Sequence, residues 1–184
     1  MHKNSILTND VETPSIINHC LSDETGLLDL YNKYNIKSTF FVTGYIAKKF
    51  TKIIKMIIDN KHEVGSHGYS HKIKDLFDIL SLKDQIENLK KSKKILEDIS
   101  RKNVISFRAS AARVNRNTAI ALHESGFKVD SSISSQRFDM FLSFGNLKQM
   151  KWIFCPRKLY FTHSENLFYN KPIVNFVHPN EFFK

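Results

Sequence analysis

Two periodicities of apolar residues alternate along this chain, and they predict alternating strands and helices. Short runs rich in β-branched and aromatic residues predict strands at residues 5–9, 38–42, 62–64, 104–107, 127–130 and 172–177. Apolar residues at helical spacing predict helices at residues 27–34, 50–58, 82–99 and 117–124. Repeated strand–helix units predict an α/β fold with a mostly parallel sheet or barrel, whose chemistry lies at the carboxyl ends of the strands.

Composition limits the size of the fold and the class of partner. A chain of 184 residues with 41% hydrophobic content can form one domain with a sizeable core, so we expect a single domain over residues 1–184. The formal net charge of +10 favours anionic partners in general. The lysines are spread over the predicted helices as on solvated faces, and the chain has no nucleic-acid-binding motif. We therefore expect no nucleic acid partner, and a basic nucleic-acid-binding protein is the weakest alternative.

The sequence has no feature of an exported or membrane protein. Its first residues lack the apolar core of a signal peptide, and no apolar run is long enough for a transmembrane segment. Cys20 and Cys155 lie far apart without CxxC spacing, which favours reduced thiols over a disulfide framework. These features predict a cytoplasmic protein.

Two histidines form the first candidate for chemistry. His67 and His71 are four positions apart, directly after a predicted strand. On one helical turn, residues at this spacing project from the same face, so both rings could bind one metal ion. The spacing alone is weak evidence, because a polar turn followed by a solvated helix would produce it too. A metal site therefore requires a third ligand, preferably a carboxylate.

Further polar residues follow the other predicted strands. Together with the two histidines, a rim of strand ends would gather Asp10, Glu12, Arg108, Asp130 and His178. This combination of carboxylates, imidazoles and a guanidinium suits metal-assisted hydrolysis. Two simpler roles remain open, because Arg108 could neutralise a buried carboxylate and Asp130 could cap a loop. We favour the capping role for Asp130.

These motifs resemble those of the NodB-homology polysaccharide deacetylases. The similar segments are the His-pair motif at residues 66–71, the arginine motif at 107–110, the late histidine motif at 176–179 and the apolar strand at 38–42. The resemblance implies a distorted (β/α) barrel, which the short segment before His178 would leave incomplete near the C-terminus. It also implies a metal-dependent hydrolase that removes N-acetyl groups from amino sugars in a glycan or glycoconjugate.

The resemblance assigns a role to each site residue. Glu12, His67 and His71 would bind a divalent metal, for which zinc is expected and cobalt, nickel or iron would fit the same donors. Asp10 would be the general base, Arg108 would keep Asp10 ionised, and His178 would protonate the departing amine. A second alignment of the acidic motif makes Asp10 the metal ligand and places Asn9 at the position of the base.

The chain departs from the family at two site positions. Ser110 replaces the usual Pro of the arginine motif, which would loosen the backbone and mis-aim Arg108, and Gly68 replaces the usual Ser or Thr. Asn9, Ser110 and the short segment before His178 favour one alternative, and the site residues themselves leave a second one open. One is a degenerate deacetylase fold that binds a carbohydrate without cleaving it. The other is a related hydrolase of acetyl esters or C–N bonds.

Overall fold

Seven parallel strands form one curled, open sheet in the computed structural model, which describes residues 5–14, 26–132, 151–152 and 173–177. The order across the sheet is β6-β5-β4-β3-β2-β1-β7. The strands are β1 (Ser5–Val11), β2 (Ser38–Val42), β3 (Glu63–Ser66), β4 (Ser106–Phe107), β5 (Val129–Asp130), β6 (Lys151–Trp152) and β7 (Ile173–Val177). Because all the strands are parallel, their carboxyl ends meet at one edge of the sheet.

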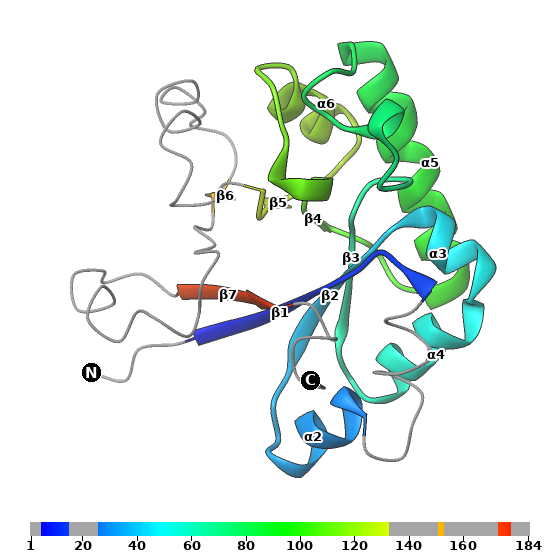
Figure 1. The fold of residues 1–184 in the computed structure, drawn as a ribbon, viewed down its shortest axis with the longest axis vertical. Coiled ribbons are helices and arrows are strands. Elements are labelled where there is room, and N and C mark those ends of the chain that lie inside the picture. Colours follow the sequence, from blue (N-terminus) through cyan, green and yellow to red (C-terminus); the bar gives the residue numbers. More distant parts are fainter. Residues whose placement is uncertain (1–4, 15–25, 133–150, 153–172, 178–184) are drawn as a thin grey trace.

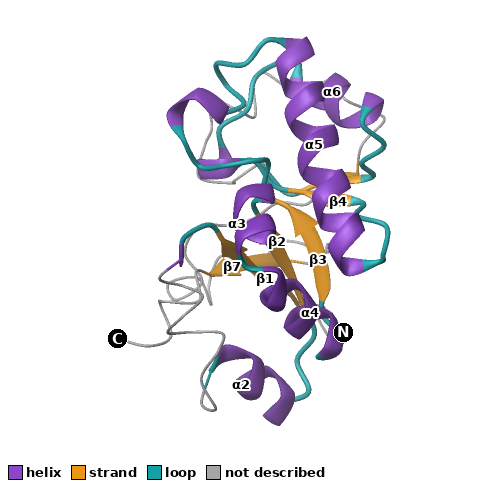
Figure 2. Ribbon diagram, turned by 90° about the vertical axis from the view of Figure 1, so that its right-hand side faces the viewer, coloured by secondary structure: helices purple, strands orange, loops and turns teal. Residues whose placement is uncertain are grey.

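The described helices lie together on one side of the sheet (Figures 1 and 2). The α-helices are α2 (Leu27–Lys33), α3 (Gly44–Lys49), α4 (Thr51–Asp59), α5 (Leu82–Ser100) and α6 (Thr118–Glu124). Two short 3-10 turns, η2 (Ile73–Asp75) and η3 (Ser110–Ala112), follow the loops at the ends of β3 and β4. The longest helix, α5, contacts α3, α4, α6 and β3, so it joins the helical layer to the sheet.

The core fills the space between these helices and the sheet. All five residues of β2 are buried, as expected for a parallel strand that is covered on both faces. Ile53, Ile54 and Ile57 of α4 are at most 4% exposed and supply the facing apolar stripe. Burying each such side chain stabilises the fold by about 1.5–3 kcal/mol, so this layer fixes the sheet that carries the site.

The predicted α/β architecture is confirmed, with local differences. The strand predicted at residues 5–9 continues to Val11, so Asp10 lies in β1. Ahead of the predicted helix at residues 50–58, the chain forms a further helix, α3, which ends at Phe50 where the backbone turns to φ −129° and ψ 60°. Its start is stabilised by the Thr43 side chain, which accepts a hydrogen bond from the Ile46 amide. Strand β6 was not predicted either.

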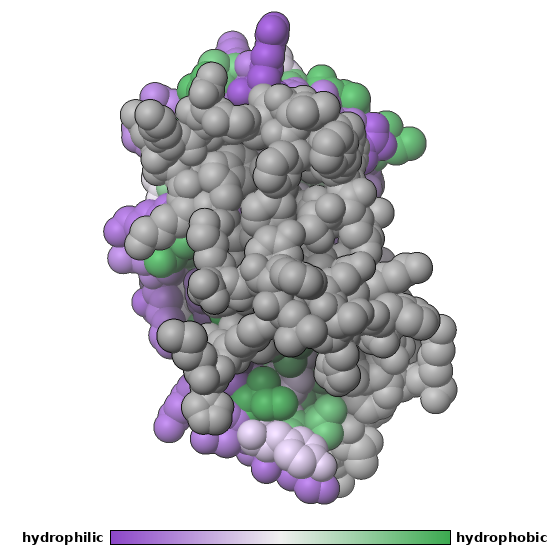
Figure 3. All heavy atoms as spheres, turned by 90° about the vertical axis from the view of Figure 1, so that its left-hand side faces the viewer, coloured by the Kyte–Doolittle hydropathy of each residue, from purple (hydrophilic) through white to green (hydrophobic). Residues whose placement is uncertain are grey.

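Within the described part of the chain, no helix is both long and apolar enough to cross a membrane. Figure 3 shows the face opposite the helices. The described residues visible on this face are largely hydrophilic along one margin, with smaller hydrophobic groups. The segment before His178, on which the prediction of an incomplete barrel rests, lies outside the described residues except for β7.

Candidate active site

The polar side chains of strand β1 lie on its two opposite faces. Asn9 is fully buried on one face, where its side-chain amide donates to Ser38 Oγ at 2.6 Å and its oxygen accepts from the Tyr31 hydroxyl at 2.9 Å. Thr8 and Asp10 hydrogen-bond to Arg108 instead. Successive side chains of a strand point to opposite faces, so Asn9 belongs to the packing between β1 and α2.

Arg108 lies at the end of β4 and is 3% exposed. Its Nη1 donates to Asp10 Oδ1 at 2.8 Å, and its Nη2 donates to Thr8 Oγ1 at 2.9 Å and to Ser131 Oγ at 2.7 Å. Its Nε donates to the Ser131 carbonyl at 3.3 Å, and the guanidinium lies 4.4 Å from the centre of the Phe41 ring. These contacts aim Arg108 at Asp10, so the predicted mis-aiming caused by Ser110 is wrong.

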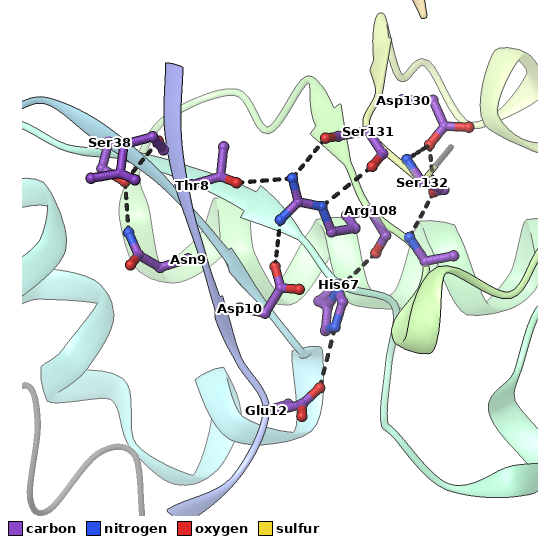
Figure 4. A network of polar contacts seen from close by, with 12 residues as sticks. Thr8, Asn9, Asp10, Glu12, Ser38, His67, Arg108, Asp130, Ser131 and Ser132 are labelled. Carbon is purple, nitrogen blue, oxygen red and sulfur yellow. Dashed lines mark hydrogen bonds and ion pairs between the residues drawn. The ribbon is translucent and has the colours of Figure 1, made fainter. Parts of the chain in front are cut away.

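Glu12, His67 and His71 meet beside this pair. Glu12 Oε2 lies 3.4 Å from His67 Nε2 and 2.8 Å from His71 Nε2. One donor atom from each residue lies within 4.8 Å of the other two. His67 is buried and the His71 side chain is 37% exposed, so the cluster reaches the described surface on one side. Figure 4 shows His67 beside Asp10 and below Arg108, with Glu12 below all three.

The two histidines lie on a loop, and the prediction that they share a helical turn is wrong. Gly68 adopts φ +73°, a left-handed conformation that interrupts any helix at this point. The carbonyls of Gly68 and Tyr69 accept hydrogen bonds from the Gly44 and Tyr45 amides, at 2.9 and 2.8 Å. The start of α3 therefore holds the loop and supplies the geometry that a helical turn would have provided.

A hydrogen bond to the His67 ring indicates which nitrogen is available to a ligand. His67 Nδ1 lies 2.8 Å from the Arg108 carbonyl, which can only accept, so we assign the ring proton to Nδ1. The Nε2 lone pair of the neutral ring then faces the Glu12 carboxylate at 3.4 Å. Two acceptors this close are favourable only with a cation or a proton between them. This donor set of two imidazoles and one carboxylate fits a divalent metal.

Contacts within this cluster shift the pKa values of Glu12 and His71. Burial acts to raise the pKa of Glu12, but hydrogen bonds and charge interactions with His67 and His71 outweigh it and hold this pKa well below its usual range. The hydrogen bond to Glu12 raises the pKa of His71, with burial opposing and the charge of Asp10 adding to the shift. The carboxylate is therefore ready to bind a cation at neutral pH.

Asp130 caps the loop after β5, as predicted. It is fully buried, and its Oδ1 accepts hydrogen bonds from the Ser132 amide at 2.9 Å and from the Ser132 hydroxyl. Ser132 Oγ in turn accepts from the Ala109 amide at 2.8 Å. Burial raises the pKa of Asp130 to about 6, although its hydrogen bonds oppose the shift. Asp130 thus supports the backbone around Arg108 from a neighbouring strand.

The structure unites five of the six predicted site residues: Asp10, Glu12, His67, His71 and Arg108. His178 lies outside the described residues, directly after β7, whose Val177 pairs with Asn9 of β1. Sequence reasoning missed Thr8, Ser131 and Ser132. Thr8 could have been found because it is two residues before Asp10 on the same strand face, whereas the serines gave no signal beyond following a predicted strand.

Known proteins are similar to this chain in sequence and in fold. The family profile for polysaccharide deacetylase matches residues 19–129, more than half of the chain. A peptidoglycan deacetylase from Helicobacter pylori is 33% identical over 112 residues, which cover 61% of this chain and 37% of that protein. The structure of the peptidoglycan deacetylase PdaC from Bacillus subtilis is 26% identical, with a TM-score of 0.54, over 65% of this chain and 55% of that chain.

A further structure is similar in fold alone. It is that of a CE4 family pseudoenzyme from Bacillus anthracis, with a TM-score of 0.65 at 17% identity over 96% of this chain and 55% of that chain. The present chain thus spans less than two thirds of each of these proteins. Because the family profile covers more than half of its residues, this chain belongs to the polysaccharide deacetylase (NodB-homology) family.

Proposed function

We propose that this chain is a metal-dependent hydrolase that removes the N-acetyl group from an amino sugar in a glycan or glycoconjugate. The observation that carries the proposal is the juxtaposition of the Glu12, His67 and His71 donors with the buried Asp10–Arg108 pair at one edge of the sheet. A metal-binding cluster beside an acid–base group is the arrangement that hydrolysis of an amide requires.

The donor atoms favour zinc, and cobalt, nickel or iron would suit the same residues. When bound by Glu12, His67 and His71, such an ion supplies a Lewis acid, which makes water more acidic and an acetyl carbonyl more electrophilic. The His67 Nδ1 contact with the Arg108 carbonyl would hold the imidazole with Nε2 toward the ion. The protein thus prepares the site through groups outside the ligand set.

Asp10 would accept the proton of the attacking water. Arg108 donates to its Oδ1 at 2.8 Å, which fixes the direction of the carboxylate. The departing amine needs a proton from a separate acid, and an imidazole can supply one near neutral pH. We assign this step to His178, which directly follows the strand paired with β1.

Two observations support an active enzyme over a degenerate binding protein. Asn9 is bonded to Ser38 and Tyr31 on the opposite face of β1 from Asp10, which supports the alignment with Asp10 as base and Glu12 as ligand. Ser110, the second departure from the family, is hydrogen-bonded and leaves Arg108 aimed at Asp10. Both residues that argued for lost activity are therefore compatible with a competent site.

The names of the relatives suggest the first substrate to test. The Helicobacter pylori and Bacillus subtilis proteins are peptidoglycan deacetylases, so an N-acetylated glycan strand is the appropriate class. The test measures acetate released from an N-acetylglucosamine oligomer and from peptidoglycan, with a chelator and after zinc is added back. Chelator-sensitive release would support the proposal. Release only from an acetyl ester, or ring opening of a cyclic amide, would assign the site to a related hydrolase.

A further inference from the structure

Two buried hydrogen bonds join the loop of the His pair to the loop of Arg108. In the first, His67 Nδ1 contacts the Arg108 carbonyl at 2.8 Å. In the second, the Ser110 hydroxyl donates to the His67 carbonyl at 2.9 Å. His67 and Ser110 are each 1% exposed, so neither bond competes with bulk water. His67 donates in the first bond and Ser110 donates in the second, so the two loops are joined at two points.

The second bond completes the support of the His67 backbone. The His67 amide donates to the Val42 carbonyl at 3.0 Å, and its carbonyl accepts from Ser110. Strand β2 therefore fixes one side of this residue and the arginine loop fixes the other. Removal of the hydroxyl would leave a buried carbonyl without this partner, which is unfavourable and lets the peptide rotate.

We propose that Ser110 is a positioning residue that fixes His67 for metal binding, and this inference rests on the proposed function. The family usually has proline at this position, and proline has no hydroxyl to reach the His67 carbonyl. In this chain the serine lacks the rigid ring of proline, but its hydroxyl forms a direct hydrogen bond between the arginine motif and the His-pair motif. The substitution thereby couples the metal-binding loop to the loop that carries the partner of Asp10.

The test compares zinc affinity, by competition with a chelator, for the wild-type chain and the Ser110→Ala and Ser110→Thr variants. Loss of a supporting contact of this kind weakens metal binding by about 10–100-fold, and we expect Ser110→Ala to lie near the lower limit. Ser110→Thr keeps the hydroxyl and should restore affinity. The cobalt absorption spectrum, which reports ligand geometry, should change in Ser110→Ala and return in Ser110→Thr.

Ser92→Ala is the matched control. Ser92 is also fully buried and also hydrogen-bonded, to Ser66 Oγ at 2.9 Å and to the Leu89 carbonyl at 3.1 Å, but it does not contact His67. It should lower the melting temperature without changing zinc affinity. If Ser110→Ala fails to fold, Ser110→Cys offers a weaker donor of similar size, for which we expect an intermediate affinity.

The outcomes separate the two proposals. Equal zinc affinity of the wild type and the Ser110 variants would overturn the role of Ser110 and leave the metal site intact. A wild-type chain that binds no zinc, cobalt or nickel would overturn both. A lower melting temperature of Ser110→Ala with unchanged affinity and cobalt spectrum would show a purely structural serine, which also contradicts the inference.

Discussion

Arg108 and Asp10 form a buried ion pair at 2.8 Å although they are 98 positions apart in the sequence. Each comes from a different strand of the sheet, and the pair is surrounded by hydroxyl groups of Thr8 and Ser131 that bind the guanidinium. A carboxylate held in this way keeps one orientation. The pair therefore links the stability of the fold to the acid–base chemistry that we propose for the site.

Replacing Asp10 by Asn tests its role as a base. An amide cannot accept the proton of water, so we expect kcat for acetate release to fall by about 100- to 10,000-fold. Metal content should not change, because Asp10 is not in the proposed ligand set. Asp98→Asn, which removes an exposed carboxylate of α5, is the control and should retain full activity. Normal turnover by Asp10→Asn would exclude it as the base.

Replacing Arg108 by Met tests the ion pair in folding. The Asp10 charge would remain buried without its cation, and such a change lowers the free energy of unfolding by about 3–5 kcal/mol. The double variant Arg108→Met/Asp10→Asn should recover part of this loss, because the unpaired charge is gone. Urea denaturation at neutral pH measures both. A double variant as unstable as the sum of the single variants would show that the two residues are not coupled.

His62 should make stability depend on pH. It is buried beside Tyr31 and Phe40 and accepts a hydrogen bond from the Ser38 amide through Nδ1. Burial, with a contribution from the charge of Lys37, lowers its pKa below 6.5. Protonation is therefore easier in the unfolded chain, so its contribution to stability is complete above pH 6.5 and decreases as the pH falls toward the folded pKa.

The comparison with His62→Asn isolates this effect, because asparagine keeps an acceptor for the Ser38 amide but does not titrate. The difference in unfolding free energy between the wild type and the variant should grow as the pH rises to about 6.5 and then stay constant. His71 has its pKa raised by Glu12, so its own contribution has the opposite sign and cancels in the difference. A difference independent of pH would refute the assignment.

Glycine in place of Ala112 should stabilise the fold. It has φ +51° and follows Ala111 with φ +55°, so two consecutive residues with side chains adopt a left-handed backbone beside the site. This conformation costs a non-glycine residue about 1–2 kcal/mol, and glycine loses part of that gain through its more flexible unfolded state. We expect Ala112→Gly to raise the free energy of unfolding by about 0.5–1 kcal/mol.

Ala121→Gly is the control for this prediction, because it places glycine in the middle of α6. It should lower the free energy of unfolding by about 1 kcal/mol, since helical glycine is costly. Thermal unfolding of both variants gives the sign directly. A destabilised Ala112→Gly would mean that the methyl group makes contacts worth more than the backbone strain.

The sequence predicts those parts of the structure that depend on local patterns. Strand β2 and helix α5 have the expected positions because a continuous apolar run and a long amphipathic stripe with Ser81 at its start are unambiguous. Helix α3 was missed because its six residues are too few to show a helical period. The strand predicted at residues 62–64 corresponds to β3, but β3 begins at Glu63 and extends to Ser66, and the His pair lies beyond it on a loop.

The candidate site residues could be predicted from the sequence, but their arrangement could not. The rule that parallel strands place their carboxyl ends together was sufficient to group Asp10, Glu12, His67 and Arg108. The position of Asn9 stayed open because the strand was expected to end there; once β1 continues through Asp10, alternation places Asn9 on the opposite face, where the Tyr31 hydroxyl binds it. The sequence also could not show the hydrogen bond between Ser110 and the His67 carbonyl, because these residues lie on two different loops.

The metal content of the purified chain shows whether Glu12, His67 and His71 bind a metal ion. Elemental analysis should compare the wild type with the His67→Ala/His71→Ala variant after both have been loaded with zinc and dialysed. We expect about one equivalent of zinc in the wild type and almost none in the folded variant. Equal zinc content in the two proteins, or none in either, would contradict a metal site formed by Glu12, His67 and His71.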